Sequence, residues 1–296
     1  MQYEAAALGA ALCWAIAGMI SSAPAKHLGA IAFNRTRMVI VLVILGGYAF
    51  ATGSWLSIGG PEAELLIISG FIGIFVGDTA LFLTLNRMGP RRTAILFATN
   101  APMSVVLGWM VLGEALSFAA LAGIAITIAG VVLSIVFGKR RAQLHHWESI
   151  TGPLWAGITL GLIAALAQSV GSIIARPVME TGVDPVAASA LRVAVAALGL
   201  TALMRLPYEQ FHQRGELTKR VTGRIALSGM LGMGLGMTLL LFALEGGEVG
   251  IISTLSATSP ALMLPLLWAT TGERPAFGAW IGAALVVGGT ALIFMN

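Results

Sequence analysis

The stretch ATNAPMSVVLGWMVLGEALSFAALAGIAITIAGVVL (98–133) occurs in a second version in the same chain, ATSPALMLPLLWATTGERPAFGAWIGAALVVGGTAL (257–292). Both versions contain Ala-Thr, a proline, a tryptophan and Gly-Glu, and then an apolar run with spaced glycines. Working outward, residues 77–133 align without gaps with residues 236–292, except that Pro102 and Pro260 stand one position out of register. The sequence therefore predicts an internal repeat that involves most of the chain.

The composition places these repeats in a membrane. The chain has 296 residues, of which 57% are hydrophobic and 10% are charged. Soluble domains contain about 45–50% apolar and about 25% charged residues, so this chain could not cover a water-exposed surface. The same numbers exclude a disordered chain, and the single cysteine, Cys13, excludes a disulfide scaffold.

The apolar runs are long enough to cross a bilayer, which takes about 20 residues per helix. Ten runs lie between charged or Gly/Pro breaks, at residues 4–23, 34–52, 64–86, 92–112, 117–137, 153–175, 186–205, 224–244, 249–271 and 276–295. We therefore predict an all-α integral membrane protein with ten transmembrane helices. The predicted parts are a five-helix repeat at 1–138, a cytoplasmic connector at 139–152 and a second five-helix repeat at 153–296.

The basic residues predict the orientation, because Lys and Arg accumulate in cytoplasmic loops. All 17 of them except Arg176 and Arg192 fall in alternate loops on one side of the ten predicted helices. Both termini are therefore predicted to lie outside, and the basic pI of 9.7 reflects topology. No soluble segment could supply a nucleic-acid reading element, so no nucleic-acid partner is expected.

An odd number of helices per repeat inserts the second repeat upside down. Inverted repeats of this kind are the architecture of many secondary transporters, in which two similar halves rock around a site near the middle of the membrane. A receptor or a membrane enzyme has no general need of this symmetry. The repeat therefore favours transport by alternating access.

The repeated proline, Gly-Glu and spaced glycines resemble those of the drug/metabolite transporter superfamily, and specifically its ten-helix EamA-type transporters. In this family the fourth helix of each repeat carries the proline and ends in Gly-Glu. The resemblance implies a carrier of the bacterial inner membrane, often an exporter of amino acids or related metabolites. It also implies a central cavity formed by helices 1, 3, 4, 6, 8 and 9, and it says almost nothing about the substrate.

Asp78 is the first candidate for a functional residue. It lies in the middle of an apolar run, where an ionised carboxylate costs about 2.5–3.5 kcal/mol. We expect it to contribute to substrate binding and to carry the coupling proton. The alternative is a structural pair with a basic residue or a neutral, hydrogen-bonded acid. Its partner in the repeat alignment is Met237, so the fold itself does not require a carboxylate there.

Other charged residues fit structural roles better. Glu114 and Glu273 match between the repeats and end helices, which favours a cap or a turn-fixing hydrogen bond. Arg37 and Arg192 stand near predicted helix starts, where long side chains reach water; a gating or substrate role is the alternative. The spacing Gly73-x-x-x-Gly77 predicts close helix packing.

Uncharged polar residues and one tryptophan complete the predicted binding site. A proline in a helix frees a backbone carbonyl, which can open polar groups onto a cavity; Asn100 and Ser259 stand beside such prolines. Trp14 offers an aromatic wall for a ring or a cation, and its alternative is packing between helices. The full predicted set is Trp14, Asp78, Asn100, Gln168, Ser172, Ser256 and Ser259, with Ser169 and Thr258 as weaker candidates.

Motifs for an enzyme, a metal site or a nucleotide site do not occur in the sequence. We therefore predict a carrier without a cofactor or a metal, acting on a small-molecule substrate in the lipid bilayer and driven by a gradient, with protons as the coupling ion. A facilitator, an exporter of cationic drugs, a membrane enzyme and a non-transporting sensor or scaffold are the alternatives. A monomer is the default, because one chain contains both repeats.

Overall fold

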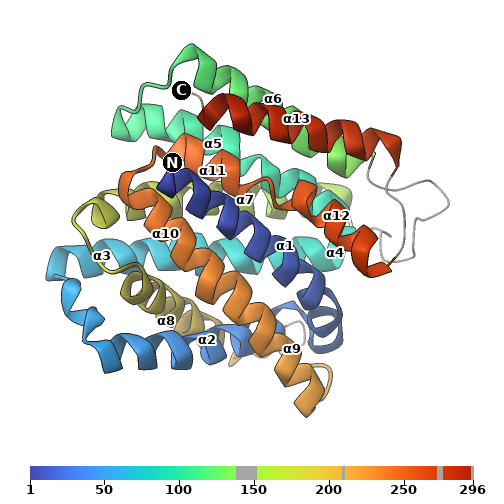
Figure 1. Ribbon diagram of the computed structural model, residues 1–296. Coiled ribbons are helices and arrows are strands. Elements are labelled where there is room, and N and C mark those ends of the chain that lie inside the picture. Colours follow the sequence, from blue (N-terminus) through green and yellow to red (C-terminus); the bar gives the residue numbers. More distant parts are fainter. Residues whose placement is uncertain (138–151, 209–210, 272–275, 295–296) are drawn as a thin grey trace.

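The computed structural model describes residues 1–137, 152–208, 211–271 and 276–294, and all regular elements in these ranges are helices (Figure 1). Most are α-helices; η1 is a 3-10 helix, and η2, η3 and η7 are π-helical. In chain order they are α1 (Gln2–Leu28), α2 (Ala30–Thr52), η1 (Ser54–Ser57), α3 (Gly60–Ser69), η2 (Gly70–Val76), α4 (Gly77–Ala98), α5 (Asn100–Leu107), η3 (Gly108–Leu112), α6 (Phe118–Val136), α7 (Leu154–Glu180), α8 (Pro185–Leu203), α9 (Lys219–Gly229), η7 (Met230–Gly236), α10 (Met237–Gly246), α11 (Val249–Ser256), α12 (Ser259–Thr271) and α13 (Phe277–Phe294).

Seven helical segments of the described residues are long and apolar enough to cross a membrane. They are Gln2–Leu28, Ala30–Thr52, Gly60–Met88, Arg92–Leu112, Leu154–Glu180, Pro185–Leu203 and Lys219–Gly246. The other three predicted spans coincide with shorter apolar helices, Phe118–Leu133, Val249–Met263 and Phe277–Ile293. All ten predicted runs are thus helical over most of their described length, and seven of them have the length and composition of a span.

The connection between the first two helices is shorter than the sequence predicts. Gly29 alone separates α1 from α2, and its φ of 87° lies in the left-handed region that glycine adopts most easily. Because α2 already begins at Ala30, Arg35 and Arg37 belong to a helix and not to the predicted loop. The predicted break after residue 86 likewise falls within α4.

Helices α6 and α13 lie side by side at one edge of the bundle, at the top of Figure 1. They touch through glycines: a Cβ on Gly123 would lie 2.9 Å from the carbonyl oxygen of Gly289, and one on Gly130 would lie 2.6 Å from that of Gly282. Gly123 aligns with Gly282 in the repeat, and Gly130 aligns with Gly289. The contact is therefore reciprocal, as it is between two copies related by a twofold axis.

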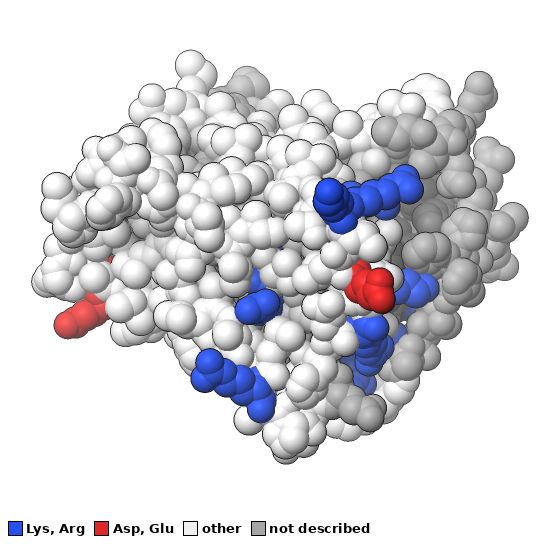
Figure 2. Space-filling view, turned by 90° about the horizontal axis from the view of Figure 1, so that it is seen from below, with Lys and Arg blue, Asp and Glu red and all other residues white. Residues whose placement is uncertain are grey.

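Other close helix pairs also join the two halves of the chain. α2 packs on α8, α4 on α7, and α1 on α10 and η7. Large apolar side chains are exposed on the outside, among them Phe50, Leu198 and Val287. Among the residues that Figure 2 colours, charged side chains form only a few small patches on this face. The arrangement is that of a multi-pass membrane protein.

Candidate functional site

Arg37 and Asp78 form an ion pair inside the bundle. An Nη2–Oδ2 distance of 2.6 Å joins the guanidinium, on α2, to the carboxylate near the start of α4. Both residues are buried, with 5% and 7% of their surface exposed. Arg37 also donates to Oδ1 of the buried Asn34 at 2.9 Å, and its guanidinium lies 4.8 Å from the ring centroid of Phe82. Of the alternatives for Asp78, the structure therefore shows the pair with a basic residue.

Arg192 lies on α8 with 1% of its surface exposed. Its Nη1 is 3.2 Å from the sulfur of Met237, the first residue of α10. A thioether sulfur is a weak acceptor, and Nε of Arg192 has no hydrogen-bond partner in the described part of the structure. Nε of Arg37 and Nδ2 of Asn34 likewise have no hydrogen-bond partner among the described residues.

The two arginines occupy equivalent places in the two halves. A π-helical segment of one half lies against the arginine of the other. A Cβ on Gly73, in η2, would lie 3.1 Å from Nη2 of Arg192, and one on Gly232, in η7, would lie 3.9 Å from Nη1 of Arg37. A glycine at position 73 leaves room for the guanidinium of Arg192, whereas a Cβ on Gly232 would be in ordinary contact with that of Arg37. Interpreting Arg37 and Arg192 as water-seeking side chains was therefore wrong, because both point into the protein.

These residues form a buried charged cluster, which we define as Arg37, Asp78, Arg192 and Met237; Asp78 interacts electrostatically with Arg192 as well as with Arg37. It contains two guanidinium groups and one carboxylate. Removing a charge from water without a partner costs several kcal/mol, and the carboxylate makes its short bond to Arg37. The cluster therefore carries one excess positive charge in the middle of the bundle.

Trp14 lies beside this cluster. Its indole Nε1 donates to the carbonyl oxygen of Gly232 at 2.8 Å. A Cβ on Gly232 would lie 4.0 Å from Cδ1 of Trp14, and Gly236 packs on the same ring. The side chain is half-buried between α1 and η7, so the structure shows the packing alternative for Trp14 and places it near Arg37.

Helix breaks occur beside both prolines, at Thr99 between α4 and α5 and at 257–258 between α11 and α12. Nδ2 of the buried Asn100 donates to the carbonyl oxygen of Phe97 at 2.7 Å, and the Ser259 hydroxyl donates to that of Ser256 at 2.9 Å. Pro260 cannot donate to this Ser256 carbonyl. Local polar side chains thus satisfy the carbonyls around the breaks.

The other predicted residues lie on α7 and α11. Ser169 donates to the backbone oxygen of Asn100 at 2.9 Å and so ties α7 to the first break. Gln168 is half-buried and Ser172 is buried, both on α7. Ser256 is buried and donates to the carbonyl oxygen of Ser253 at 3.0 Å. The structure joins Asn100 with Ser169, and Ser256 with Ser259, through hydrogen bonds.

Glu114 fixes a turn, as its match between the repeats predicts. Gly113 has a φ of 69°, which reverses the chain after η3, and the Glu114 amide donates to the carbonyl oxygen of Gly108 at 3.2 Å. The Glu114 carboxylate accepts from the backbone N–H of Val249 at 2.8 Å, at the start of α11. It therefore caps a helix of the other half; Glu273 lies outside the described residues.

None of the predicted site residues lines either of two pockets in the described part of the structure. One, of about 280 Å³, lies between Pro24, His27, Arg220 and Arg224. The other, of about 400 Å³, is apolar and lies between α2 and α8. No three His, Cys, Asp or Glu side chains in the described ranges are close enough to hold a metal ion. The residues of the charged cluster are buried in the bundle, so a solute reaches them only when helices separate.

Arg37 and Arg192 were not included in the predicted binding site and had a gating or substrate role only as the alternative, although the sequence contains a signal for one of them. Arg192 stands in ASALRVAVAAL, as isolated in its apolar run as Asp78 is in FVGDTALF. Applying the same criterion to basic residues would have selected it. Arg37 gives no such signal, because it follows Asn34 and Arg35 at the polar end of its run.

Comparison with known proteins agrees with this fold. A solved structure described as "Crystal structure of protein" superimposes with a TM-score of 0.78 at 18% identity, covering 99% of this chain and 96% of that one. No curated protein sequence matches the chain. The model of the EamA-like transporter family matches twice, at residues 1–136 and 155–295. The chain therefore belongs to the EamA-like transporter family, within the drug/metabolite transporter superfamily.

Proposed function

We propose that this membrane transporter moves a small organic solute, an amino acid or a related metabolite, out of the cell by alternating access. The observation that carries the proposal is the buried charged cluster, to which both halves of the chain contribute. Buried charges in a membrane protein mark a substrate or ion pathway by default. A site between two similar halves becomes open to one side and then the other as the halves rock.

The proposed architecture is ten spans in two inverted repeats, 1–138 and 153–296, joined by a cytoplasmic connector at 139–152. The reciprocal contact between α6 and α13 supports the repeat, and so does the double match of the family model. The three shorter apolar helices supply the last spans. One chain then contains the whole pathway, and a monomer suffices.

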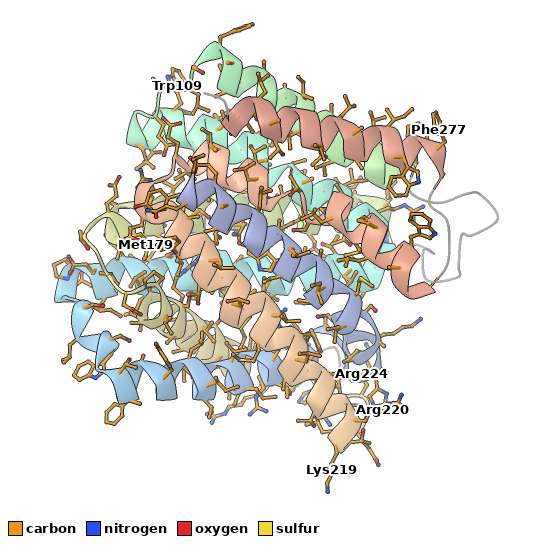
Figure 3. The ribbon with its side chains drawn as sticks, viewed as in Figure 1. Trp109, Met179, Lys219, Arg220, Arg224 and Phe277 are labelled. Atoms are coloured by element: carbon orange, nitrogen blue, oxygen red, sulfur yellow. The ribbon has the colours of Figure 1, made fainter. Side chains whose placement is uncertain are left out.

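We place both termini in the periplasm of a bacterial inner membrane. Basic side chains gather at one end of the bundle, where Arg220 and Arg224 near the start of α9 share a cavity with His27 (Figure 3). Acidic residues lie at the opposite end of the bundle. There, at the C-terminal end of α7, Arg176 pairs with Glu180 at 2.7 Å. The basic end corresponds to the cytoplasm. Lys139, Arg140, Arg141 and Arg274 belong to this prediction but lie outside the described residues.

Asp78 is the proposed proton carrier. Protonation of its carboxylate would release Arg37 and weaken the contact between α2 and α4, and deprotonation would restore the pair. Opposite charges 2.6 Å apart attract strongly in a medium of low dielectric constant. Uptake of a proton would break this ion pair, and release of the proton would restore it. The proton gradient would thus be coupled to a change in helix packing.

Purified protein in liposomes with an imposed pH gradient tests the transport. A mixed pool of amino acids, related metabolites and cationic dyes is offered, and the solutes that accumulate are identified by mass spectrometry. We expect accumulation that collapses with a protonophore. Equilibration without accumulation would show a facilitator, and accumulation of the dyes alone would favour the cationic-drug alternative. No flux of any solute would contradict transport of these classes.

Two variants separate proton coupling from a structural role of Asp78. Asp78→Asn leaves Arg37 buried without its partner, and such a loss typically costs about 3–5 kcal/mol of stability. The double variant Asp78→Asn with Arg37→Gln removes both charges and restores much of that stability. We expect the double variant to remain in the membrane and to equilibrate solute without accumulating it. Uphill transport by the double variant would show that the pair is only structural.

A further inference from the structure

Arg192 is the buried cation for which the described part of the structure supplies no counter-ion in contact. It has 1% of its surface exposed, its Nε has no partner, and its Nη1 faces the sulfur of Met237 at 3.2 Å. We propose that Arg192 binds the carboxylate of the transported solute, which must therefore be a carboxylic acid in its anionic form. This inference rests on the proposed function, in that the ligand is the solute that the protein moves.

The other half of the chain shows which group is missing. Arg37, the counterpart of Arg192, faces Asp78 at 2.6 Å. Met237 is the aligned counterpart of Asp78, and each of them directly follows a glycine, Gly77 or Gly236, close to the end of a π-helical segment. The second half therefore has the arginine of this arrangement without the carboxylate. A carboxylate of the solute, bound where the Met237 sulfur lies, would supply the missing group.

The net charge of the cluster favours a solute group that carries a single negative charge. Two guanidinium groups and one carboxylate leave one positive charge in excess, and a monocarboxylate neutralises it. A phosphate monoester carries about −1.5 to −2 at neutral pH and would leave the cluster with excess negative charge. A solute that is cationic and has no carboxylate would add a second unpaired charge, which argues against the cationic-drug alternative; in an amino acid the ammonium group is accompanied by a carboxylate.

The local geometry suits a planar anion. A guanidinium presents a fork of N–H donors that matches both oxygens of a carboxylate. Gly73 keeps one side of the fork free of side-chain atoms, since a Cβ there would lie 3.1 Å from Nη2. On another side, Met237 is an unbranched, flexible side chain that can turn away at little cost. When the helices separate, a carboxylate can take the place of the sulfur at Arg192.

Binding to the purified protein in detergent tests the carboxylate requirement. The probes are acids paired with amides that lack the carboxylate charge: benzoate with benzamide, and phenylalanine, leucine and threonine with the corresponding amino-acid amides, which keep the α-amino group. Binding is followed by the shift in thermal midpoint and by tryptophan fluorescence. At least one acid should bind about tenfold or more tightly than its amide, the effect of one charge-assisted hydrogen-bonded pair. Equal binding of every acid and its amide would overturn the proposal.

Variants of Met237 and Arg192 test where the carboxylate of the solute binds. Met237→Asp gives Arg192 a permanent carboxylate, so it should raise the thermal midpoint and weaken binding of the acid about tenfold or more. Met237→Asn is the matched control with similar shape and no charge, and it should retain most of the preference for acid over amide. Arg192→Gln should remove that preference. If Met237→Asp and Met237→Asn bind the acid equally well, the carboxylate does not occupy this position.

The liposome experiment keeps the two proposals distinguishable. Transport of acids and amides at equal rates would overturn the role of Arg192 and leave the transport function standing. Acid binding that depends on Arg192, without flux of any solute, would support the binding site and contradict the proposed function. Arg220→Gln, an exposed basic residue at the end of the bundle, serves as the control for a general loss of positive charge.

Discussion

Single residues in this protein differ in how completely their charge is compensated. Asp78 has a guanidinium at 2.6 Å, Glu114 has a backbone N–H at 2.8 Å, and Arg192 has a thioether. The first two arrangements are stable without a ligand. The third leaves a buried charge available to whatever anion can reach it, and this difference is the basis of the inference about the solute.

Glu248 gives a prediction of pH dependence. Burial at the start of α11 and the nearby carboxylate of Glu114 raise the pKa of Glu248, and Arg176 lowers it in part. Ionised Glu248 therefore destabilises the folded state, an effect present at neutral pH and lost as the pH falls and Glu248 takes up its proton. Glu248→Gln should raise the thermal midpoint at neutral pH, with a difference that shrinks on acidification.

The control for this measurement is Glu64→Gln, because Glu64 is exposed near the start of α3. Its thermal midpoint should follow that of the parent at every pH. A stabilisation by Glu248→Gln that stayed constant down to acid pH would show that charge is not the cause.

At the scale of elements, glycine positions decide how closely the helices approach. The contact between α6 and α13 leaves no room for a methyl group, while other glycines on the same helix face open space. Neighbouring residues of one helix therefore differ in what a substitution costs. The π-helical segments η2 and η7 use the same device to bring their backbones against Arg192 and Arg37.

Gly288 and Gly289 on α13 provide a matched pair. A Cβ on Gly289 would lie 2.7 Å from both the carbonyl oxygen of Gly123 and the backbone nitrogen of Thr127, whereas one on Gly288 would meet nothing within 4 Å. Gly289→Ala should lower the thermal midpoint in detergent, because overpacking costs about 1–3 kcal/mol. Gly288→Ala should leave it unchanged or raise it slightly, since alanine favours helix by about 1 kcal/mol. Equal effects of the two would refute the contact between α6 and α13.

At the scale of the whole molecule, the helices form one bundle whose two halves share their interior. Helix pairs across the halves include α2 with α8, α4 with α7 and α6 with α13. Both halves contribute residues to the charged cluster. A motion of one half against the other therefore changes the surroundings of Arg37, Asp78 and Arg192 at the same time.

Cysteine labelling tests the orientation of the whole molecule. The only cysteine, Cys13, is buried and is first replaced in Cys13→Ser. In that background Thr181→Cys lies between α7 and α8, and Arg220→Cys lies near the start of α9; both positions are exposed. A maleimide that crosses the outer but not the inner membrane should label Thr181→Cys in intact cells, and Arg220→Cys only after permeabilisation. The reverse pattern would place the termini in the cytoplasm.

Much of the fold could be predicted from the sequence, because membrane spans depend on local composition. Residues 4–23 and 153–175 were predicted as helices from apolar length alone, and α1 and α7 contain nearly all of them. The helix ends were less accurate, since Gly29 closes a turn that was predicted to be longer. The turn role of Glu114 followed from its match with Glu273 and is confirmed by its bond to Val249.

Hydropathy is a property of the local sequence, and it was sufficient to predict a helical membrane protein; the internal sequence match predicts two similar halves. Only the tertiary structure decided that Asp78 pairs with Arg37 and that Arg192 faces Met237. These pairs join residues 41 and 45 positions apart in the chain. Which buried charges meet depends on how the helices cross, and the local sequence around each residue does not contain that information.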